Sequence, residues 1–144
     1  MDDFERLWSE LGSHGVMVLS TCAGSRVTSR SMSVVIFGGK FCFQTNKDYL
    51  KSRQISDNPN VALCFGKFSI EGSCKMLGHP EDESEFMDNL SRAYPDAVKR
   101  WSSLPYERVF AVTPRLIRSW IYENDIPYIE EWDLVKKTYR KERQ

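Results

Sequence analysis

The sequence has no excess charge of either sign and no long hydrophobic run. Its 144 residues include 20 basic and 20 acidic side chains, so the formal net charge is zero. A neutral molecule has no overall field to hold a polyanion such as DNA, and any phosphate site must be made by local groups. No stretch approaches the roughly 20 apolar residues that cross a bilayer. Residues 1–7, MDDFERL, are acidic and amphipathic and do not resemble a signal peptide, so we expect a cytoplasmic protein.

Cysteine and histidine are also scarce. The four cysteines are far apart and each lies within an apolar run, which is neither zinc-ligand spacing nor the pattern of a secreted disulfide framework. We expect all of them to be reduced thiols in the core: Cys22, Cys42, Cys64 and Cys74. His14 and His79 have no second histidine or carboxylate at metal-binding spacing, so no metal site is predicted. The absence of a Gly-x-Ser-x-Gly motif leaves a serine nucleophile without support.

The sequence does contain a series of short β-rich segments separated by turn residues. Six strands are predicted, at residues 15–22, 26–37, 40–45, 61–65, 68–77 and 108–122. Gly38 and Gly39 form a two-residue turn that tolerates positive φ, which joins the second and third strands as a hairpin. The fourth strand is a continuous apolar run and is expected to be fully buried. Pro114 cannot donate to a sheet ladder, and it predicts a bulge or an edge within the sixth strand.

Helical patterns flank these strands. Residues 2–12 have apolar side chains at helical spacing and end at a glycine, which predicts an amphipathic helix over one mouth of the sheet. A crossover helix is expected within residues 47–56, and a third helix after Pro80, where acidic residues follow the proline. The basic end of residues 123–144 is expected to be a frayed, solvated tail in preference to a contact for RNA or an acidic partner.

These elements predict the fold class. A single domain is expected over residues 1–144, with its core at about 5–122 and a C-terminal extension at 123–144. Six strands joined by short hairpins and one crossover helix must close on themselves to hide their edges. The predicted fold is therefore mainly β with peripheral helices: a six-stranded antiparallel split β-barrel of Greek-key type.

Polar residues that suit a phosphate are concentrated in two segments that the predicted hairpin brings near each other. Residues 28–33, TSRSMS, lie on the second strand, and residues 44–46, QTN, precede the crossover helix. The unpaired N–H groups and the dipole at the start of a helix attract phosphate. Thr45 can add a hydroxyl, while Lys51 and Arg30 can add positive charge. Either cation alone is more simply a solvated or ion-paired side chain, but their combination predicts a phosphate site.

This combination of segments resembles the pyridoxamine 5′-phosphate oxidase-like FMN-binding split barrels, which include general stress and nitroimidazole-reductase-like flavoproteins. The shared pattern is Arg30-Ser31-Met32, then Phe43-Gln44-Thr45-Asn46, then Lys51, and then the run QISDNPNVAL at residues 54–63. The resemblance covers roughly residues 5 to 122. It implies a homodimer with FMN sites at the subunit interface. The cofactor-binding residues that it implies are Arg30, Ser31, Met32, Ser33, Gln44, Thr45, Asn46, Lys51 and Trp120.

The resemblance also implies roles for these residues. The expected phosphate ligands are Arg30, Thr45 and Lys51. The strand backbone around Met32 and Ser33 is expected to line the flavin ring, where directed N–H donors stabilise the reduced flavin. Trp120 lies in the region where the family often places an aromatic residue near the flavin of the partner subunit. An aromatic-rich dimer seam explains this residue and its aromatic neighbours nearly as well.

The sequence also departs from the resemblance. True pyridoxamine-phosphate oxidases carry a basic residue beside the helix lysine and an arginine-x-histidine element near the C terminus, whereas here Leu50 precedes Lys51 and no such pair follows Trp120. Vitamin B6 oxidation is therefore disfavoured. Three functions stay open: an FMN-dependent oxidoreductase acting on a small acceptor, a non-catalytic flavin- or haem-binding carrier or sensor, and a deazaflavin-dependent reductase. No catalytic residue is predicted, because the flavin itself supplies the reactivity.

Overall fold

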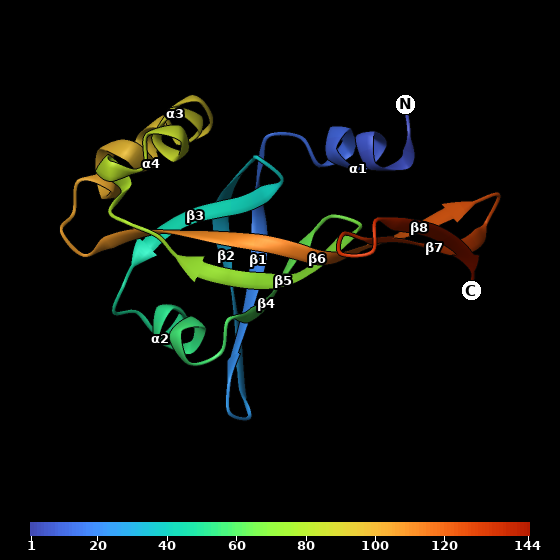
Figure 1. Cartoon of the computed structure of the whole chain (residues 1–144), viewed down its shortest axis with the longest axis horizontal. Helices are drawn as coiled ribbons and strands as arrows, with labels where there is room; N and C mark the ends of the chain where they lie inside the picture. Colours follow the sequence, from blue (N-terminus) through green and yellow to red (C-terminus); the bar gives the residue numbers. More distant parts are fainter.

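The computed structural model describes all 144 residues and is mainly β (Figure 1). Its antiparallel strands follow the order β3-β2-β1-β4-β5-β6-β7-β8, and β3 also pairs with β6. This last pairing closes β1 to β6 into a ring, so the predicted six-stranded barrel is confirmed. The strands are β1 (His14–Ala23), β2 (Arg26–Phe37), β3 (Lys40–Asn46), β4 (Asn60–Phe65), β5 (Phe68–Met76), β6 (Glu107–Glu123), β7 (Ile126–Asp133) and β8 (Thr138–Arg143). None of the helices has the length and apolar character needed to cross a membrane.

The barrel is split between β2 and β3. These two strands pair only beside their turn, where residues 35–37 meet residues 40–42. Gly38 and Gly39 have φ of 58° and 70°, which a two-residue hairpin turn requires. Farther along, β2 continues against β1, whereas β3 crosses to β6. The two strands that carry the candidate site therefore diverge and leave an opening between them.

The barrel interior holds the main hydrophobic core, a cluster of 18 buried residues. Helix α1 (Asp3–Leu11) contributes Leu7 and Leu11 to it, with 0% and 2% of their surface exposed. The side chain of Asp2 accepts a hydrogen bond from the Glu5 N–H at 2.8 Å and so caps the start of the helix. The predicted amphipathic helix over one mouth of the barrel is thus confirmed (Figure 1).

A second, smaller core lies outside the barrel under helix α3 (Ser84–Ala93), which packs on β2, β3 and β6. Phe86 and Leu90 of this helix are buried there with Val35 and Val109. Before α3 comes the short turn η1 (Pro80–Asp82); after it come α4 (Pro95–Ala97) and the π-helical turn η2 (Val98–Ser102). The sequence analysis predicted the helix after Pro80 but no element between that helix and the strand at residues 108–122.

The predicted irregularity at Pro114 is a bulge. The register between β5 and β6 shifts at Glu71 and Gly72, where Glu71 faces Leu116 and Gly72 faces Pro114. A Cβ on Gly72 would lie 2.5 Å from the Thr113 carbonyl oxygen, so only glycine permits this close approach of the two strands. The bulge divides β6 into a first half that pairs with β3 and a second half that pairs with β7.

Two burial predictions were wrong. Strand β4 is not fully buried: Val61 and Leu63 point into the barrel, whereas Cys64 is exposed. The reason is that β4 forms part of the barrel wall, so alternate residues face outward even in an apolar run. Cys42 and Cys74 are buried free thiols, and burial raises the pKa of each to about 12. Cys22 is only half-buried, so the expectation of four core thiols holds for two of them.

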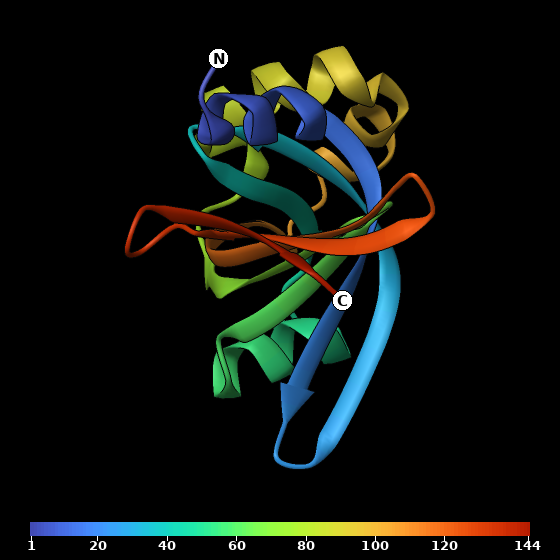
Figure 2. The ribbon, with the colours of Figure 1, turned by 90° about the vertical axis from the view of Figure 1, so that its right-hand side faces the viewer.

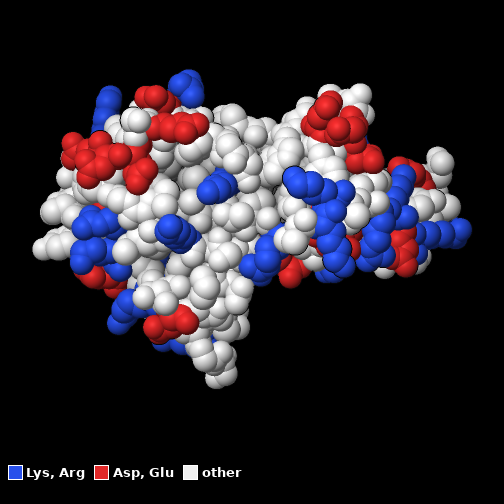
Figure 3. All heavy atoms as spheres, in the orientation of Figure 1, with Lys and Arg blue, Asp and Glu red and all other residues white.

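The expectation of a frayed C-terminal tail was also wrong. Strands β7 and β8 form a hairpin that continues the sheet beyond β6 (Figure 2). Two basic residues of β8 have acidic partners on β7 and at the end of β6: Arg140 Nε lies 3.1 Å from Glu131, and Lys141 Nζ lies 2.6 Å from Glu123. Basic and acidic side chains are accordingly interspersed at this end of the molecule (Figure 3). The basic residues at 138–143 therefore belong to a paired strand and not to a free tail.

The hairpin is attached to α1 through two side chains of β7. Trp132 is completely buried in the barrel core, and its Nε1 donates a hydrogen bond to the Asp3 carbonyl oxygen at 3.0 Å. Glu130, 3% exposed, accepts hydrogen bonds from Arg6, from the Tyr139 hydroxyl at 2.6 Å and from the Ser119 hydroxyl at 2.9 Å. The contacts of Glu130 therefore connect α1, β6 and β8.

Replacing Glu130 with glutamine is expected to lower the stability of the protein at neutral pH and to weaken its acid dependence. Burial would raise the pKa of Glu130, but the hydrogen bonds from Arg6, Tyr139 and Ser119 outweigh burial and hold it below its usual value. The carboxylate therefore stabilises the fold fully above the unfolded-state pKa of about 4.3, and this contribution is lost as the pH falls through the lower folded-state pKa.

Urea unfolding of the wild type and the Glu130→Gln variant, at pH values from about 7 down to about 3, tests this prediction. The control is Glu123→Gln, because the Glu123 side chain is 50% exposed. An acid-induced loss of stability that is as large in Glu130→Gln as in the wild type would show the prediction to be wrong.

Candidate functional site

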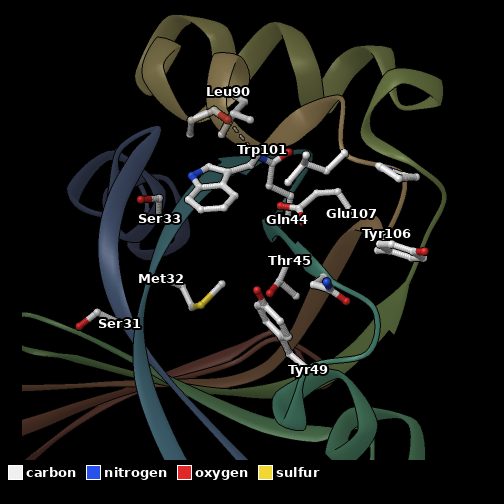
Figure 4. A pocket seen from close by; sticks show the side chains of 14 residues that line it. Ser31, Met32, Ser33, Gln44, Thr45, Tyr49, Leu90, Trp101, Tyr106 and Glu107 are labelled. Atoms are coloured by element: carbon white, nitrogen blue, oxygen red, sulfur yellow. Dashed lines mark hydrogen bonds between the residues drawn. The ribbon is translucent and has the colours of Figure 1, made fainter.

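A cavity of about 550 Å³ lies in the opening between β2 and β3 (Figure 4). The β2 wall comes from residues 31–33 and the β3 wall from residues 44–46. In Figure 4 the side chains of Met32 and Thr45 approach the cavity from opposite walls. Six of the nine predicted cofactor-binding residues therefore line one space: Ser31, Met32, Ser33, Gln44, Thr45 and Asn46.

The segment between α3 and β6 lines the rest of the cavity. Trp101, Leu104, Pro105 and Tyr106 supply an apolar and aromatic surface that the sequence analysis did not assign to the site. Gln44 fastens this segment to β3: its Oε1 accepts a hydrogen bond from the Ser102 hydroxyl at 2.8 Å, and its Nε2 donates to the Ala97 carbonyl at 3.4 Å. The sequence signal that could have indicated this surface is the presence of Trp101 and Tyr106 in a stretch with no predicted helix or strand. We call residues 95–106 the roof segment.

Neither Arg30 nor Lys51 lines the cavity, although the nearby residues Ser31 and Tyr49 do. Burial lowers the pKa of Lys51, and the positive charge of Arg30 lowers it further, which places the two cations near each other. Neither cation forms an ion pair with a carboxylate. The Lys51 ammonium lies 4.9 Å from the ring centre of Tyr49, which does line the cavity. The charge of Glu107 reaches Lys51, but neither cation is in an ion pair, so two half-buried cations make this region suited to an anion.

Helix α2 (Leu50–Asp57) begins beside these cations. Tyr49 precedes its first turn, and no side chain there accepts a hydrogen bond from the helix. The first N–H groups of the helix therefore keep their capacity to donate to a ligand. Ser52 fixes the start of the helix against β3, because its hydroxyl donates to the Asn46 carbonyl at 2.7 Å.

Gln54 of α2 holds Arg30 in place through two threonines. Its Oε1 accepts hydrogen bonds from the hydroxyls of Thr21 and Thr28, each at 2.6 Å. Because those hydroxyl protons are used, the oxygen lone pairs accept from Arg30, which donates to Thr21 at 2.8 Å and also to Thr28. Gln54 is 3% exposed, and its Nε2 donates to the Arg26 carbonyl at 3.2 Å. The sequence analysis quoted Gln54 within a motif but did not give it this role.

Trp120 lies away from the other predicted site residues of its own chain. It is on the second half of β6, beyond the bulge, and 47% of its surface is exposed. Its nearest aromatic neighbour is Tyr122, with the ring centres 6.2 Å apart. It does not line the cavity between β2 and β3.

One acidic residue in the cavity was missed by sequence reasoning. Glu107, the first residue of β6, is 6% exposed and lines the cavity. Burial raises the pKa of its carboxyl, an effect that the charges of Lys51 and His79 partly oppose. No sequence signal marked it, since its position at the cavity follows from the pairing of β6 with β3.

Comparison with known sequences assigns the chain to a family. The sequence profile of the family pyridoxamine 5′-phosphate oxidase matches residues 5–121, which is most of the chain. The chain therefore belongs to the pyridoxamine 5′-phosphate oxidase family, as the motif resemblance predicted. The pyridoxine/pyridoxamine 5′-phosphate oxidase of Prochlorococcus marinus (strain MIT 9303) is 33% identical over 99 residues, which cover 68% of this chain and 40% of that protein. The chain thus spans less than half the length of this relative.

Solved structures share the fold at low sequence identity. General Stress Protein 26 from Bacillus anthracis is 21% identical with a TM-score of 0.60, over 74% of this chain and 84% of that one. A pyridoxamine 5′-phosphate oxidase-related, FMN-binding protein from Nostoc punctiforme is 13% identical with a TM-score of 0.61, over 90% of this chain and 86% of that one. These similarities establish the split-barrel fold.

Proposed function

We propose that the protein binds FMN non-covalently and acts as an oxidoreductase that passes electrons from reduced flavin to a small acceptor. The observation that carries the proposal is the pair of cations, Arg30 and Lys51, which lie without carboxylate partners beside an aromatic-lined cavity of about 550 Å³. A ligand that joins a phosphate to a planar ring system satisfies both parts. The family membership and the FMN-binding protein of the same fold support this choice.

The residues present fit FMN. Arg30, Lys51 and Thr45, with the uncapped first turn of α2, would hold the phosphate. The polar backbone of residues 31–33 would meet the polar edge of the ring, and the roof segment would cover its apolar part and exclude water. When bound, FMN supplies the electron transfer, and the protein supplies binding, orientation and electrostatics.

The proposed assembly is a homodimer with the cavity at the subunit interface. Val16 and Val18 are 60% and 41% exposed on β1, and they pair directly with Ser33 and Ser31 of the cavity wall. An apolar strip at the rim of the cavity is what a second copy would cover. Trp120 would reach the cavity from the partner copy. Sedimentation of the cofactor-loaded protein should give the mass of a dimer, and a monomeric mass would contradict this part of the proposal.

FMN is favoured over haem by the two cations beside the cavity, which suit a phosphate, and by the FMN-binding protein of the same fold. Haem iron is commonly held by a histidine, cysteine, methionine or tyrosine ligand. No histidine or cysteine lines the cavity, whereas Met32, Tyr49 and Tyr106 do, so the test below includes haem as an outcome. The exposed free thiol of Cys64 suits a reducing compartment, which supports our proposal of a cytoplasmic location.

The purified protein provides the test. A yellow preparation with an absorbance band at about 450 nm, from which mass spectrometry identifies FMN, is the expected result. Bleaching by a nicotinamide donor and recolouring by an added acceptor would support the oxidoreductase. A Soret band, or a deazaflavin in the extract, would replace FMN, and a bound flavin that no donor reduces would favour the carrier function.

The Gln54→Leu variant is expected to weaken FMN binding about tenfold while leaving riboflavin binding nearly unchanged. The reason is that Gln54 orients Arg30 through Thr21 and Thr28, and a tenfold change corresponds to about 1.4 kcal/mol, slightly less than the loss of a direct hydrogen bond to a charged group. Riboflavin lacks the phosphate, so a general loosening of the fold would weaken both ligands. Titration of flavin fluorescence measures both affinities, with Ser56→Leu on the exposed side of α2 as the control. Equal losses for FMN and riboflavin would refute the positioning role.

A further inference from the structure

We propose that His79 is a positioning residue for the second half of the roof segment: it holds the turn at residues 104–107 over the cavity and thereby sets the affinity for the ring system of the ligand. The inference rests on the proposed function only in taking that ligand to be the flavin. The position of the turn is a property of the chain itself and can be measured without any ligand.

His79 connects the short turn η1 to the roof segment through both nitrogens of its ring. Its Nδ1 lies 3.1 Å from the backbone nitrogen of Glu81, and its Nε2 lies 2.9 Å from the carbonyl oxygen of Leu104. A backbone N–H can only donate and a carbonyl can only accept, so Nδ1 is the acceptor and the ring proton is on Nε2. One side chain therefore caps η1 and also donates to a turn that lies 25 residues farther along the chain.

The backbone before His79 is fixed to the barrel wall. The Gly78 carbonyl accepts a hydrogen bond from the Val109 N–H at 2.9 Å, and the Leu77 N–H donates to the Val109 carbonyl at 2.7 Å. These bonds continue the pairing of β5 with β6. The Gly78 N–H also donates to the Glu83 carboxylate at 3.0 Å. His79 therefore reaches the roof segment from a rigid base.

The turn that His79 holds presents apolar side chains to the cavity. Leu104 and Tyr106 line the cavity, yet 41% and 55% of their surface is exposed (Figure 4). The Leu104 carbonyl that accepts from His79 also accepts from the Glu107 N–H at 3.1 Å, and this second bond closes the turn. Apolar surface favours burial, so an unanchored turn would move these side chains away from the position that suits a planar ring.

The other anchors of the roof segment do not replace His79. Gln44 holds only its first half, at residues 97 and 102. The Tyr106 carbonyl accepts from the Lys47 N–H at 2.9 Å, which fixes the turn on the side of β3. Arg108 donates to the Pro105 carbonyl at 2.9 Å, but it directly follows the turn in the chain and cannot tie it to η1. His79 is therefore the side chain that fixes the turn on the side of η1.

Two substitutions separate the two hydrogen bonds of His79. His79→Gln keeps an amide donor long enough to reach the position of Nε2, whereas His79→Asn keeps an acceptor that can cap η1 but is too short to reach Leu104. In His79→Asn, the Glu107 amide proton is expected to exchange with deuterium about fivefold faster than in the wild type, which corresponds to about 1 kcal/mol, a typical net value for a hydrogen bond. His79→Gln should restore exchange to within about twofold of the wild type.

Nuclear magnetic resonance measures the exchange of single amides, and the Val109 amide is the internal control. Its hydrogen bond to Gly78 belongs to the base, so its exchange should stay within about twofold of the wild type in both variants. Glu81→Gln is the matched variant, because the Glu81 carboxylate is 63% exposed and lies 3.8 Å from Nδ1. It should leave the exchange of Glu107 unchanged, since His79 acts through Leu104 and not through an ion pair.

Titration with FMN and riboflavin tests the consequence for binding. His79→Asn should weaken both flavins about fivefold, because the roof segment is proposed to cover the ring and not the phosphate, and His79→Gln should bind both as the wild type does. A loss for FMN alone would overturn the inference. So would wild-type exchange of Glu107 in His79→Asn, equal acceleration of Glu107 and Val109, or failure of His79→Gln to restore exchange.

The two proposals fail in different ways. A protein that binds no flavin but shows the expected exchange in the variants would refute only the proposed function. A protein that binds FMN equally well in the wild type and in His79→Asn would refute only the inference.

Discussion

Replacing both Arg30 and Lys51 with alanine is expected to weaken FMN binding by more than about a hundredfold while leaving the barrel folded. Hydrogen bonds to charged groups contribute about 1.5 to 3 kcal/mol each, so the loss of two cations removes at least two factors of ten. Neither residue belongs to the hydrophobic clusters or forms an ion pair within the fold. Burial lowers the pKa of each side chain. Flavin fluorescence titration measures the affinity, and circular dichroism checks the fold.

The matched control removes two positive charges from other positions, on the β2–β3 hairpin. Arg26 and Lys40 are exposed residues of β2 and β3, and neither lines the cavity. Their double replacement by alanine should leave FMN affinity within about twofold, because exposed charges are screened by solvent and salt. Stoichiometric flavin retained by the Arg30 and Lys51 double variant would refute the assigned phosphate site.

The largest loss of stability is expected for Trp132→Ala, at about 3 to 5 kcal/mol in urea unfolding, the usual range for removing a buried aromatic side chain. The Trp132 ring is completely buried, with ring centres 6.2 Å from Phe68 and 5.3 Å from Tyr139. Its loss would leave a cavity and free the Asp3 carbonyl from its hydrogen bond.

Val135→Ala is the comparison, because that side chain lies in the turn between β7 and β8 and is 70% exposed. Its replacement should cost less than about 1 kcal/mol. A Trp132→Ala protein as stable as Val135→Ala would mean that the C-terminal hairpin contributes little to the fold.

The barrel was predictable because its strands carry local signals. The double glycine at residues 38–39 fixed one hairpin, and the alternation in β5 fixed which side chains face inward. Pro114 marked the bulge because a missing N–H has the same consequence in any sheet. Closure of the barrel followed from the general need to cover strand edges.

The missed elements depend on contacts between distant residues. The β8 strand has few apolar residues, and its stability comes from Glu131 and Trp132 on β7, which the linear pattern does not pair with it. The roof segment is held by Gln44, which lies 58 residues from Ser102 in the sequence. The exposure of Cys64 follows from the place of β4 in the wall, which an apolar run does not encode.

The part of the candidate site that the sequence predicted is the part that the motif covers. The two segments that carry the motif do face each other across one cavity, although β2 and β3 pair for only three residues. The positioning of Arg30 by Gln54 and the burial of Glu107 could not be foreseen, since each depends on where a side chain lies after the barrel has closed. Of the nine predicted residues, Arg30 and Lys51 are tested by the double variant described above.

The split between β2 and β3 also separates the two ends of the cavity by their origin in the chain. The proposed phosphate site is built on the barrel and α2, whereas the roof segment is a single connection between α3 and β6 that no barrel strand pairs with. Insertions, deletions or substitutions in the roof segment leave the ladder hydrogen bonds intact. In this architecture the surface that would contact a substrate can therefore change through one short stretch of sequence, while the strands and helix proposed to hold the nucleotide keep their pairing.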